Sequence, residues 1–113
     1  MELRKAWCRE TTHPSYRGKW SVDNPSAGQC LVTALVVQDG YGGDIYSCKV
    51  GNNSHFVNII NERIVDKTSE QFGGTGKIKY KSGSFRKRSR ESLLKNKDVR
   101  QRYELLKARM EEV

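Results

Sequence analysis

Three side chains suited to nucleophilic catalysis follow one another along the chain: Cys30, His55 and Asp66. A thiolate attacks an acyl carbon, an imidazole accepts and returns the proton, and a carboxylate holds the imidazole in one tautomer and supports its charged form. The order of these residues predicts a Cys-His-Asp triad, provided that the fold brings the three together.

The cysteine is expected at the start of a hydrophobic helix. From Gly28 the sequence GQCLVTALVVQDGYGGD is apolar at four-residue spacing and then rich in glycine, which predicts a buried helix of about ten residues. A thiol at a helix N-terminus faces unsatisfied backbone N–H groups and the positive end of the helix dipole, and both favour the thiolate. We therefore expect Cys30 to be the nucleophile.

A predicted antiparallel sheet places the histidine and the aspartate. We expect strands at residues 44–50, 55–60 and 63–67. A two-residue connection at Asn61-Glu62 would pair Val57 with Asp66. Because side chains alternate, His55 then shares a face with Asp66 at a diagonal separation of about 7–8 Å, which the two side chains can bridge. Asn58 faces the other way and is expected to be structural.

Side-chain amides near the cysteine could assist the backbone N–H of Cys30 in binding an oxyanion. Gln29 precedes the cysteine and Asn24 lies six residues before it, although either could instead cap the helix or brace the loop. We rank Gln29 ahead. His13 is an alternative base, but it lies in a proline-containing loop with no evident carboxylate partner, and His55 is preferred.

The two other cysteines, Cys8 and Cys48, are expected in a helix and a strand as small buried hydrophobic residues. Three cysteines without a CxxC pair indicate neither a disulfide framework nor a metal site, and the proposed chemistry needs no cofactor. The chain has no apolar run of about 18 residues and no apolar leader, so we expect a soluble cytoplasmic protein with no membrane partner.

The length of 113 residues and the hydrophobic content of 35% predict one small α+β domain over residues 1–113. A helix is expected over about 2–11, followed over 12–27 by a loop with Trp20 as its buried anchor. A fourth strand is suggested at 77–81.

A C-terminal helix is expected from about Lys97, with Asn96 as its N-cap. One apolar stripe runs along this helix, formed by Val99, Tyr103, Leu106, Met110 and Val113. We expect the stripe to dock on the sheet of a monomer, and a weak dimer held by the stripe is the alternative.

The net charge of +8 comes from the last third of the chain. Residues 1–75 hold 8 Lys or Arg against 8 Asp or Glu, which leaves 13 against 5 for residues 76–113. The basic run contains Arg86, Lys87, Arg88 and Arg90. It could neutralise phosphates, but few aromatic residues accompany it and a solvated surface is preferred. The alternative function is a non-catalytic binding or adaptor domain whose basic segment, about 85–113, engages an acidic protein or nucleic acid.

Four segments carry a resemblance to a known family. The runs WSVDNPSAGQCLVTALVVQDGYGGDI, HFVNII and IVDKTSEQF, with SRESLLKNKDVRQRYELLKARM further on, resemble the YunG-like family of small bacterial proteins over nearly the whole chain.

A more distant similarity is with papain-like and transglutaminase-like thiol enzymes, where a helix-start cysteine precedes a strand histidine and then an aspartate. It implies a small papain-like (cysteine-proteinase-like) fold, with the cysteine helix packed on an antiparallel sheet of three or four strands and C-terminal helices. It also implies Cys30 as nucleophile, His55 as general base and acid, and Asp66 as orienter. The reaction would be hydrolysis or transfer at an amide or thioester carbonyl. A second lobe is not expected, so the site should be open or shallow.

Overall fold

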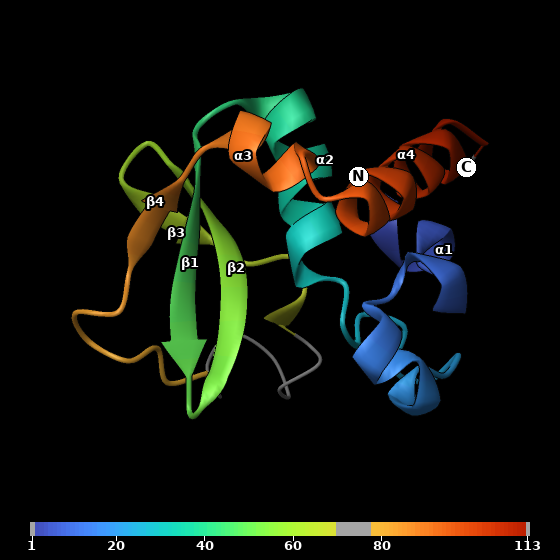
Figure 1. Cartoon of the computed structure of the whole chain (residues 1–113), viewed down its shortest axis with the longest axis horizontal. Helices are drawn as coiled ribbons and strands as arrows, with labels where there is room; N and C mark the ends of the chain where they lie inside the picture. The colour runs from blue at the N-terminus through green and yellow to red at the C-terminus, as the bar shows by residue number, and fades with distance from the viewer. Residues whose placement is uncertain (1, 70–77, 113) are drawn as a thin grey trace.

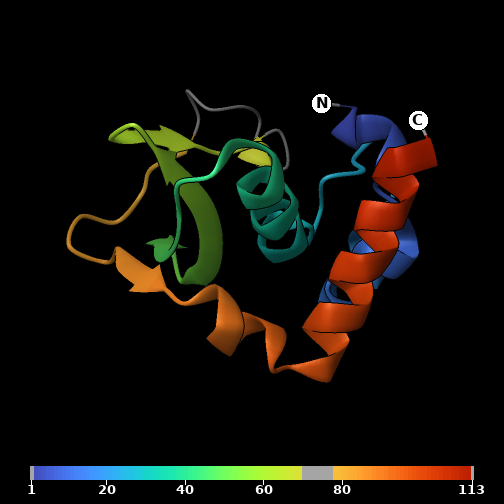
Figure 2. The same cartoon turned by 90° about the horizontal axis from the view of Figure 1, so that it is seen from above.

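The computed structural model describes residues 2–69 and 78–112 as an α+β protein. In chain order the elements are α1 (Leu3–Ala6), the 3-10 helices η1 (Arg9–Thr11) and η2 (Pro14–Lys19), α2 (Cys30–Tyr41), β1 (Asp44–Val50), β2 (Asn53–Ile60), β3 (Arg63–Val65), β4 (Arg86–Arg88), α3 (Arg90–Leu94) and α4 (Lys97–Glu112). The sheet is antiparallel with strand order β3-β2-β1-β4. Helix α2 lies between this sheet and a layer formed by α4 and the N-terminal helices (Figures 1 and 2).

Helix α2 is buried around its whole circumference in its middle turns. Every residue from 32 to 37 is buried, whereas a surface helix buries one stripe. Two polar contacts fix it on opposite sides. The Nδ2 of Asn58 on β2 donates to the carbonyl of Ala34 at 2.9 Å, and the indole N–H of Trp7 donates to the Oγ1 of Thr33 at 2.9 Å. Asn58 thus has the structural role expected of it.

The main hydrophobic core joins α2 to the helical layer. Its buried members are Leu3, Ala6, Trp7, Val32, Ala34, Leu35, Val36, Ile45, Leu93, Val99, Tyr103 and Leu106. The buried tryptophan is Trp7, not Trp20 as predicted: Trp20 is half-buried, and its indole N–H donates to the carbonyl of Pro25.

The N-terminal segment is broken, although one helix over about 2–11 was expected. Helix α1 ends at Ala6 and η1 begins at Arg9. Between them, the N–H of Cys8 donates to the hydroxyl of Thr11, and that hydroxyl donates back to the carbonyl of Cys8. Such local side-chain bonds compete with the helical hydrogen-bond pattern.

The described part of the apolar stripe of α4, from Val99 to Met110, packs mainly on α2, α1 and η1, and Val113 lies outside the described residues. The predicted docking on the sheet is wrong. The reason is that α2 already occupies the space between α4 and the sheet (Figure 2). Asn96 caps the helix as expected, since its Oδ1 accepts from the N–H of Val99 at 3.1 Å. Two arginines of α4 also reach the N-terminal segment: Arg102 donates to the carbonyl of Thr11, and Arg109 donates to that of Ala6.

The predicted connection between β2 and β3 is confirmed. Ile60 pairs with Arg63, and the two residues between them, Asn61 and Glu62, have φ of 51° and 66°. Both values are positive, as tight two-residue hairpin turns require.

The fourth strand differs from the prediction. Strand β4, within the basic run, pairs with β1, whereas Tyr80 makes only an isolated bridge with Val50. Lys77 lies outside the described residues. The charged side chains of β4 suit a strand at the exposed edge of a sheet.

Two adjacent leucines of α4 test its docking. Leu106 is fully buried and Leu105 is 39% exposed. We expect Leu106→Ala to lower the free energy of unfolding by about 2–5 kcal/mol and Leu105→Ala by about 0.5 kcal/mol or less. Urea denaturation of both variants measures this, and equal losses would contradict the packing.

Candidate active site

Cys30 is the first residue of α2, as predicted. Gln29 precedes the helix, and the first intrahelical bond runs from the N–H of Thr33 to the carbonyl of Gln29. The N–H groups of the first turn have no partner within a helix, so they face outward together with the thiol. The side chain of Cys30 is half-buried.

The bend that leads into α2 depends on Gly28. Its φ is +69°, and a Cβ placed there would lie 2.7 Å from the Cβ of Tyr16 and 2.8 Å from the Cγ2 of Thr12. Only glycine fits this combination of a left-handed backbone and close packing. The absence of a side chain at Gly28 therefore lets η2 lie directly against the cysteine loop.

His55 and Asp66 form a buried charge-assisted pair. The Nε2 of His55 lies 2.7 Å from the Oδ2 of Asp66, and their side chains are 2% and 1% exposed. Strand β3 ends at Val65, opposite Asn58, so no β3 residue pairs with the part of β2 that carries His55. The predicted pairing of Val57 with Asp66 is thus not formed, because the strand expected over 63–67 ends at Val65, and Asp66 reaches His55 from the first residue after β3.

The carboxylate of Asp66 is held by further donors. Its Oδ2 also accepts from the hydroxyl of Tyr80 at 2.7 Å, and its Oδ1 accepts from the N–H and the hydroxyl of Thr68. The Tyr80 ring stacks on the His55 ring with centroids 6.4 Å apart. These contacts fix both members of the pair.

The thiol of Cys30 completes the row: it lines the same cavity as His55, and its interaction with the imidazole raises the His55 pKa. Since Nε2 of His55 faces Asp66, the ring nitrogen left for the thiol is Nδ1. The structure thus brings Cys30, His55 and Asp66 together in the order needed for proton transfer from sulfur to imidazole.

The surroundings of His55 favour its charged form. Burial alone would lower its pKa, but the hydrogen bonds to Asp66 and Cys30 and the negative charges of both partners raise the pKa to about 9. Burial would also raise the pKa of Asp66, yet the bonds and charge of His55 together with Tyr80 and Thr68 lower it. At neutral pH the pair is imidazolium and carboxylate.

The other histidine and the other thiols have different surroundings. His13 is largely exposed, and its Nδ1 accepts from the N–H of Ser15. Partial desolvation of the ring, together with the charge of Arg102, lowers its pKa. Cys48 is buried, and desolvation with the nearby Asp66 raises its pKa to about 11. Cys8 is half-buried.

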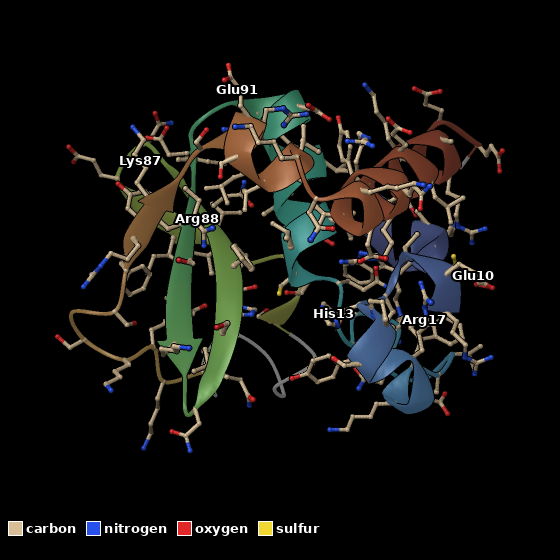
Figure 3. All side chains as sticks on the ribbon, in the orientation of Figure 1. Glu10, His13, Arg17, Lys87, Arg88 and Glu91 are labelled. Atoms are coloured by element: carbon tan, nitrogen blue, oxygen red, sulfur yellow. The ribbon has the colours of Figure 1, made fainter. Side chains whose placement is uncertain are left out.

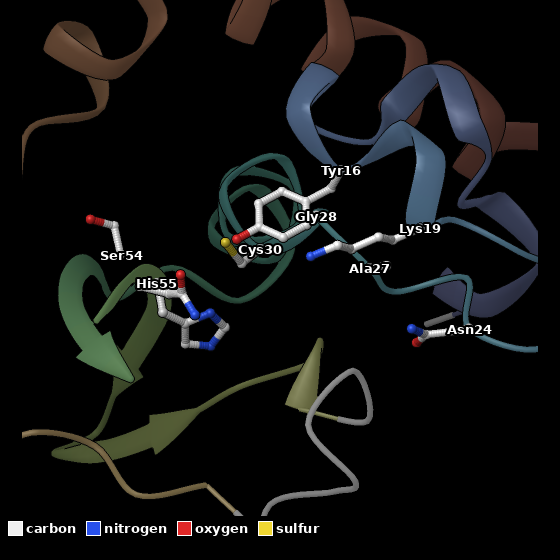
Figure 4. Close-up of a pocket in the computed structure, with 9 residues that line it drawn as sticks. Tyr16, Lys19, Asn24, Ala27, Gly28, Cys30, Ser54 and His55 are labelled. Atoms are coloured by element: carbon white, nitrogen blue, oxygen red, sulfur yellow. The ribbon is translucent and has the colours of Figure 1, made fainter. Parts of the chain in front are cut away.

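The two side-chain amides predicted to bind an oxyanion, Gln29 and Asn24, have different surroundings. Both N–H groups of the fully buried Gln29 amide are engaged, by the carbonyl of Cys8 at 2.9 Å and by the hydroxyl of Thr12 at 2.6 Å. Gln29 therefore braces the loop, which was the alternative for it, and has no N–H left for an oxyanion. Asn24 lines the same cavity as Cys30 (Figure 4).

Two cavities adjoin Cys30. Both are lined by Cys30 itself and by Tyr16, Gly28 and Ser54. The lysine cavity, of about 290 Å³, is also lined by Lys19, Asn24, Ala27, Asn53 and His55. The arginine cavity, of about 300 Å³, is also lined by His13, Ser15, Leu31, Phe56 and Arg102. Tyr16 and Lys19 reach from η2 toward Cys30 (Figure 4).

Tyr16, Lys19 and Tyr80 were not among the residues selected from the sequence. Tyr16 and Lys19 come from a turn-rich segment whose course only tertiary packing decides. Among the groups that donate to the Asp66 carboxylate, Thr68 could have been found from the sequence. An aspartate often accepts a hydrogen bond from the backbone N–H two residues later, as Asp66 does from Thr68.

Within residues 2–69 and 78–112, no three His, Cys, Asp or Glu side chains are grouped so as to hold a metal ion. None of the helices in these ranges is both long and apolar enough to cross a membrane.

Fold and site together define an α+β protein with a thiol, an imidazole and a carboxylate aligned beside an open cleft. The chain belongs to the YunG family, whose model, described as "YunG protein", matches residues 1–113. It is 46% identical over 70 residues to a Bacillus subtilis (strain 168) protein named "Uncharacterized protein YunG". That match covers 62% of this chain and 56% of the relative, so the chain spans little more than half of the relative's length. No solved structure matches the chain significantly.

Two glycines in or beside η2 test the close approach at the cysteine loop. We expect Gly28→Ala to lower the free energy of unfolding by about 1–3 kcal/mol, because the added methyl meets Tyr16 and Thr12 in a strained backbone. At Gly18 a Cβ meets nothing within 4 Å, and Gly18→Ala should change stability by about 0.5 kcal/mol or less. Equal effects in thermal or urea unfolding would contradict this account.

The raised pKa of His55 predicts a pH-dependent stability. The pKa of His55 is about 9 in the folded protein and about 6.5 in the unfolded chain. Protonation of His55 therefore stabilises the folded state fully below about pH 6.5, and this stabilisation is lost as the pH rises to about 9. Relative to His55→Gln, the wild type should therefore lose free energy of unfolding across this window.

The other histidine provides the control for this measurement. The pKa of His13 is lowered, so its effect on the pH dependence of stability lies below about pH 6.5. His13→Gln should follow the wild type between about pH 6.5 and 9 in urea titrations. A constant difference between wild type and His55→Gln over that window would refute the charged pair.

Proposed function

We propose that the protein is a thiol-dependent acyl-group hydrolase or transferase that acts on amide or thioester carbonyls. One observation carries this proposal: a buried imidazole is hydrogen-bonded to a carboxylate and lies in the same open cleft as a thiol that begins a helix and that raises the imidazole pKa. A purely structural histidine would need neither a helix-start thiol nor a cavity next to it.

In the proposed reaction, the Cys30 thiolate attacks the acyl carbon and forms a C–S bond, and the carbonyl oxygen becomes an oxyanion. The N–H of Cys30 donates to that oxygen. The His55 imidazolium then gives its proton to the leaving group as the bond to carbon breaks, which leaves a thioester. Water or an amine, deprotonated by His55, attacks the thioester and releases the product, and the thiol is regained.

Asp66 acts as a positioning residue in this scheme. Its three other hydrogen bonds, from Tyr80 and Thr68, hold the carboxylate so that His55 presents one ring nitrogen to sulfur. The charge of Asp66 also stabilises the imidazolium that forms when the thiol loses its proton.

We also propose that the fold is a small, single-lobed version of the papain-like fold. The support is the arrangement of a cysteine at the start of a central helix, a histidine on a strand and an aspartate just after the next strand. The described chain contributes one sheet, and the cleft wall opposite the sheet is formed by the short η2. An open cleft of this kind suits an extended or small substrate.

The binding or adaptor alternative rests on the basic run, and three of its four cations have partners within the chain: Arg86 donates to the carbonyls of Gly83 and Phe85, Lys87 lies 3.5 Å from Asp44, and Arg90 is bound most extensively. Arg90 donates to the carbonyl of Leu35 and to Gln38, and its Nη2 lies 2.7 Å from Asp39. Lys87 and Arg88 remain on the exposed edge strand β4 (Figure 3). No contact of these residues favours a phosphate over a carboxylate, so the thiol site is the stronger basis for a function.

Acylation with 4-nitrophenyl acetate tests the proposal. The release of 4-nitrophenolate and mapping of the acetyl group by mass spectrometry identify the residue that reacts. Cys30→Ala should abolish rapid acetylation, while Cys8→Ala and Cys48→Ala should retain it, because Cys48 is buried with a raised pKa. Comparable acetylation of all three cysteines would sink the proposal.

The pH profile separates an activated thiol from an accessible one. An ordinary thiol with a pKa of about 8.5 is only about 1% thiolate near pH 6.5. We expect His55→Ala to slow acetylation of Cys30 about tenfold or more at that pH and less at about pH 9. His13→Ala is the matched control and should keep the wild-type profile; if both variants behave alike, His55 has no role at sulfur.

A further inference from the structure

The charges around the thiol are one-sided. Among the described residues that line the lysine and arginine cavities, two carry a cationic side chain besides the His55 imidazolium, Lys19 and Arg102, and none is an aspartate or glutamate. The carboxylate of the triad, Asp66, is buried behind His55 and forms no part of either lining. A substrate in these cavities therefore meets positive charge.

The two cations differ in how far they are compensated. Arg102 is buried, with its Nε 2.9 Å from the Oδ2 of Asp98 and its Nη1 bonded to the carbonyl of Thr11. Lys19 is exposed and makes no ion pair with a carboxylate in the described parts of the chain. Within the described residues, Lys19 is thus a cation of the cleft that no carboxylate compensates.

The ring of Tyr16 supports Lys19 without neutralising it. The Nζ of Lys19 lies 5.2 Å from the centroid of this ring, within the range of cation–π attraction. Tyr16 itself is held against the cysteine loop, where Gly28 leaves room for it. The contact keeps the ammonium group on the side of Cys30, as Figure 4 shows.

The first turn of α2 adds to the same field. Its free N–H groups and helix dipole place partial positive charge at Cys30, where the reacting carbonyl must lie. Anionic groups are attracted to such a cleft, since a low-dielectric wall on each side concentrates the field.

On the basis of the proposed acyl-transfer function, we infer that the substrate is an acyl donor with a carboxylate a few bonds from the reacting carbonyl, bound by Lys19 in the lysine cavity. The cavity volume of about 290 Å³ lies at the low end for ligand sites, which suits a small acyl group that carries a carboxylate. Asn24 and Asn53, which line the same cavity, supply neutral polar groups beside the carboxylate.

Alkylation by iodoacetate and by iodoacetamide measures the preference directly. In both reactions the thiolate forms a C–S bond as the C–I bond breaks and iodide leaves. The two reagents are similar in size, and one carries a carboxylate where the other carries an amide. The ratio of their rates at Cys30, read by peptide mass spectrometry, reports charge at the site and cancels changes in thiol reactivity.

We expect Lys19→Gln to lower the iodoacetate-to-iodoacetamide ratio about three- to fivefold, the size of one unit charge acting a few ångströms away across water. Lys19→Arg should keep the ratio, and added salt should reduce it in the wild type. Lys87→Gln is the control for net charge, since Lys87 lies on β4 away from the cleft (Figure 3), and it should leave the ratio as in the wild type.

The outcomes separate the two proposals. If Cys30 reacts readily with both reagents and Lys19→Gln has the wild-type ratio, the carboxylate preference is wrong and the acyl-transfer function stands. An equal drop in Lys87→Gln would also overturn the role of Lys19, because net charge would then explain it. If Cys30 reacts with neither reagent faster than Cys8 does, the proposed function fails and the inference fails with it.

Discussion

The buried carboxylate of Asp66 is the constraint around which the described site is arranged. Removing a charge from water is costly unless it is paired and hydrogen-bonded, and Asp66 meets this requirement with four donor groups from His55, Tyr80 and Thr68. These donors come from β2, from the turn after β3 and from the segment that crosses beside Val50. Satisfying one charge therefore fixes three stretches of chain and also the orientation of the imidazole that faces sulfur.

Local chemistry explains which parts of this arrangement could be predicted from the sequence. The Asn61-Glu62 turn sets the register of β2 and β3, so that β3 ends opposite Asn58 and the next residue, Asp66, lies within reach of His55. The Gly-rich end and apolar middle of α2 likewise indicated a buried helix that begins at Cys30. In each case a few adjacent residues decide the geometry, so no knowledge of distant contacts was needed.

Long-range packing decided what the sequence could not indicate. The stripe of α4 is clear from its spacing, but its partner is α2, because that helix is buried on two sides and needs a second cover. In the same way, β1 could take its fourth neighbour from 77–81 or from the basic run, and nothing local distinguishes them. Tyr16 and Lys19 reach the cleft only because Gly28 admits η2, a contact between segments about ten residues apart.

The bonds from α4 to the N-terminal segment determine when the cleft can form during synthesis. Arg102 bonds to a carbonyl 91 residues earlier, and Arg109 to one 103 residues earlier. The segment from α1 to η1, which directly precedes Tyr16 and Lys19, is thus anchored by residues that leave the ribosome long after it does. Contacts between residues so far apart in the sequence form slowly, because a long loop must close first. The thiol therefore gains its complete surroundings only once α4 has been translated, and a partly made chain does not yet carry the assembled site.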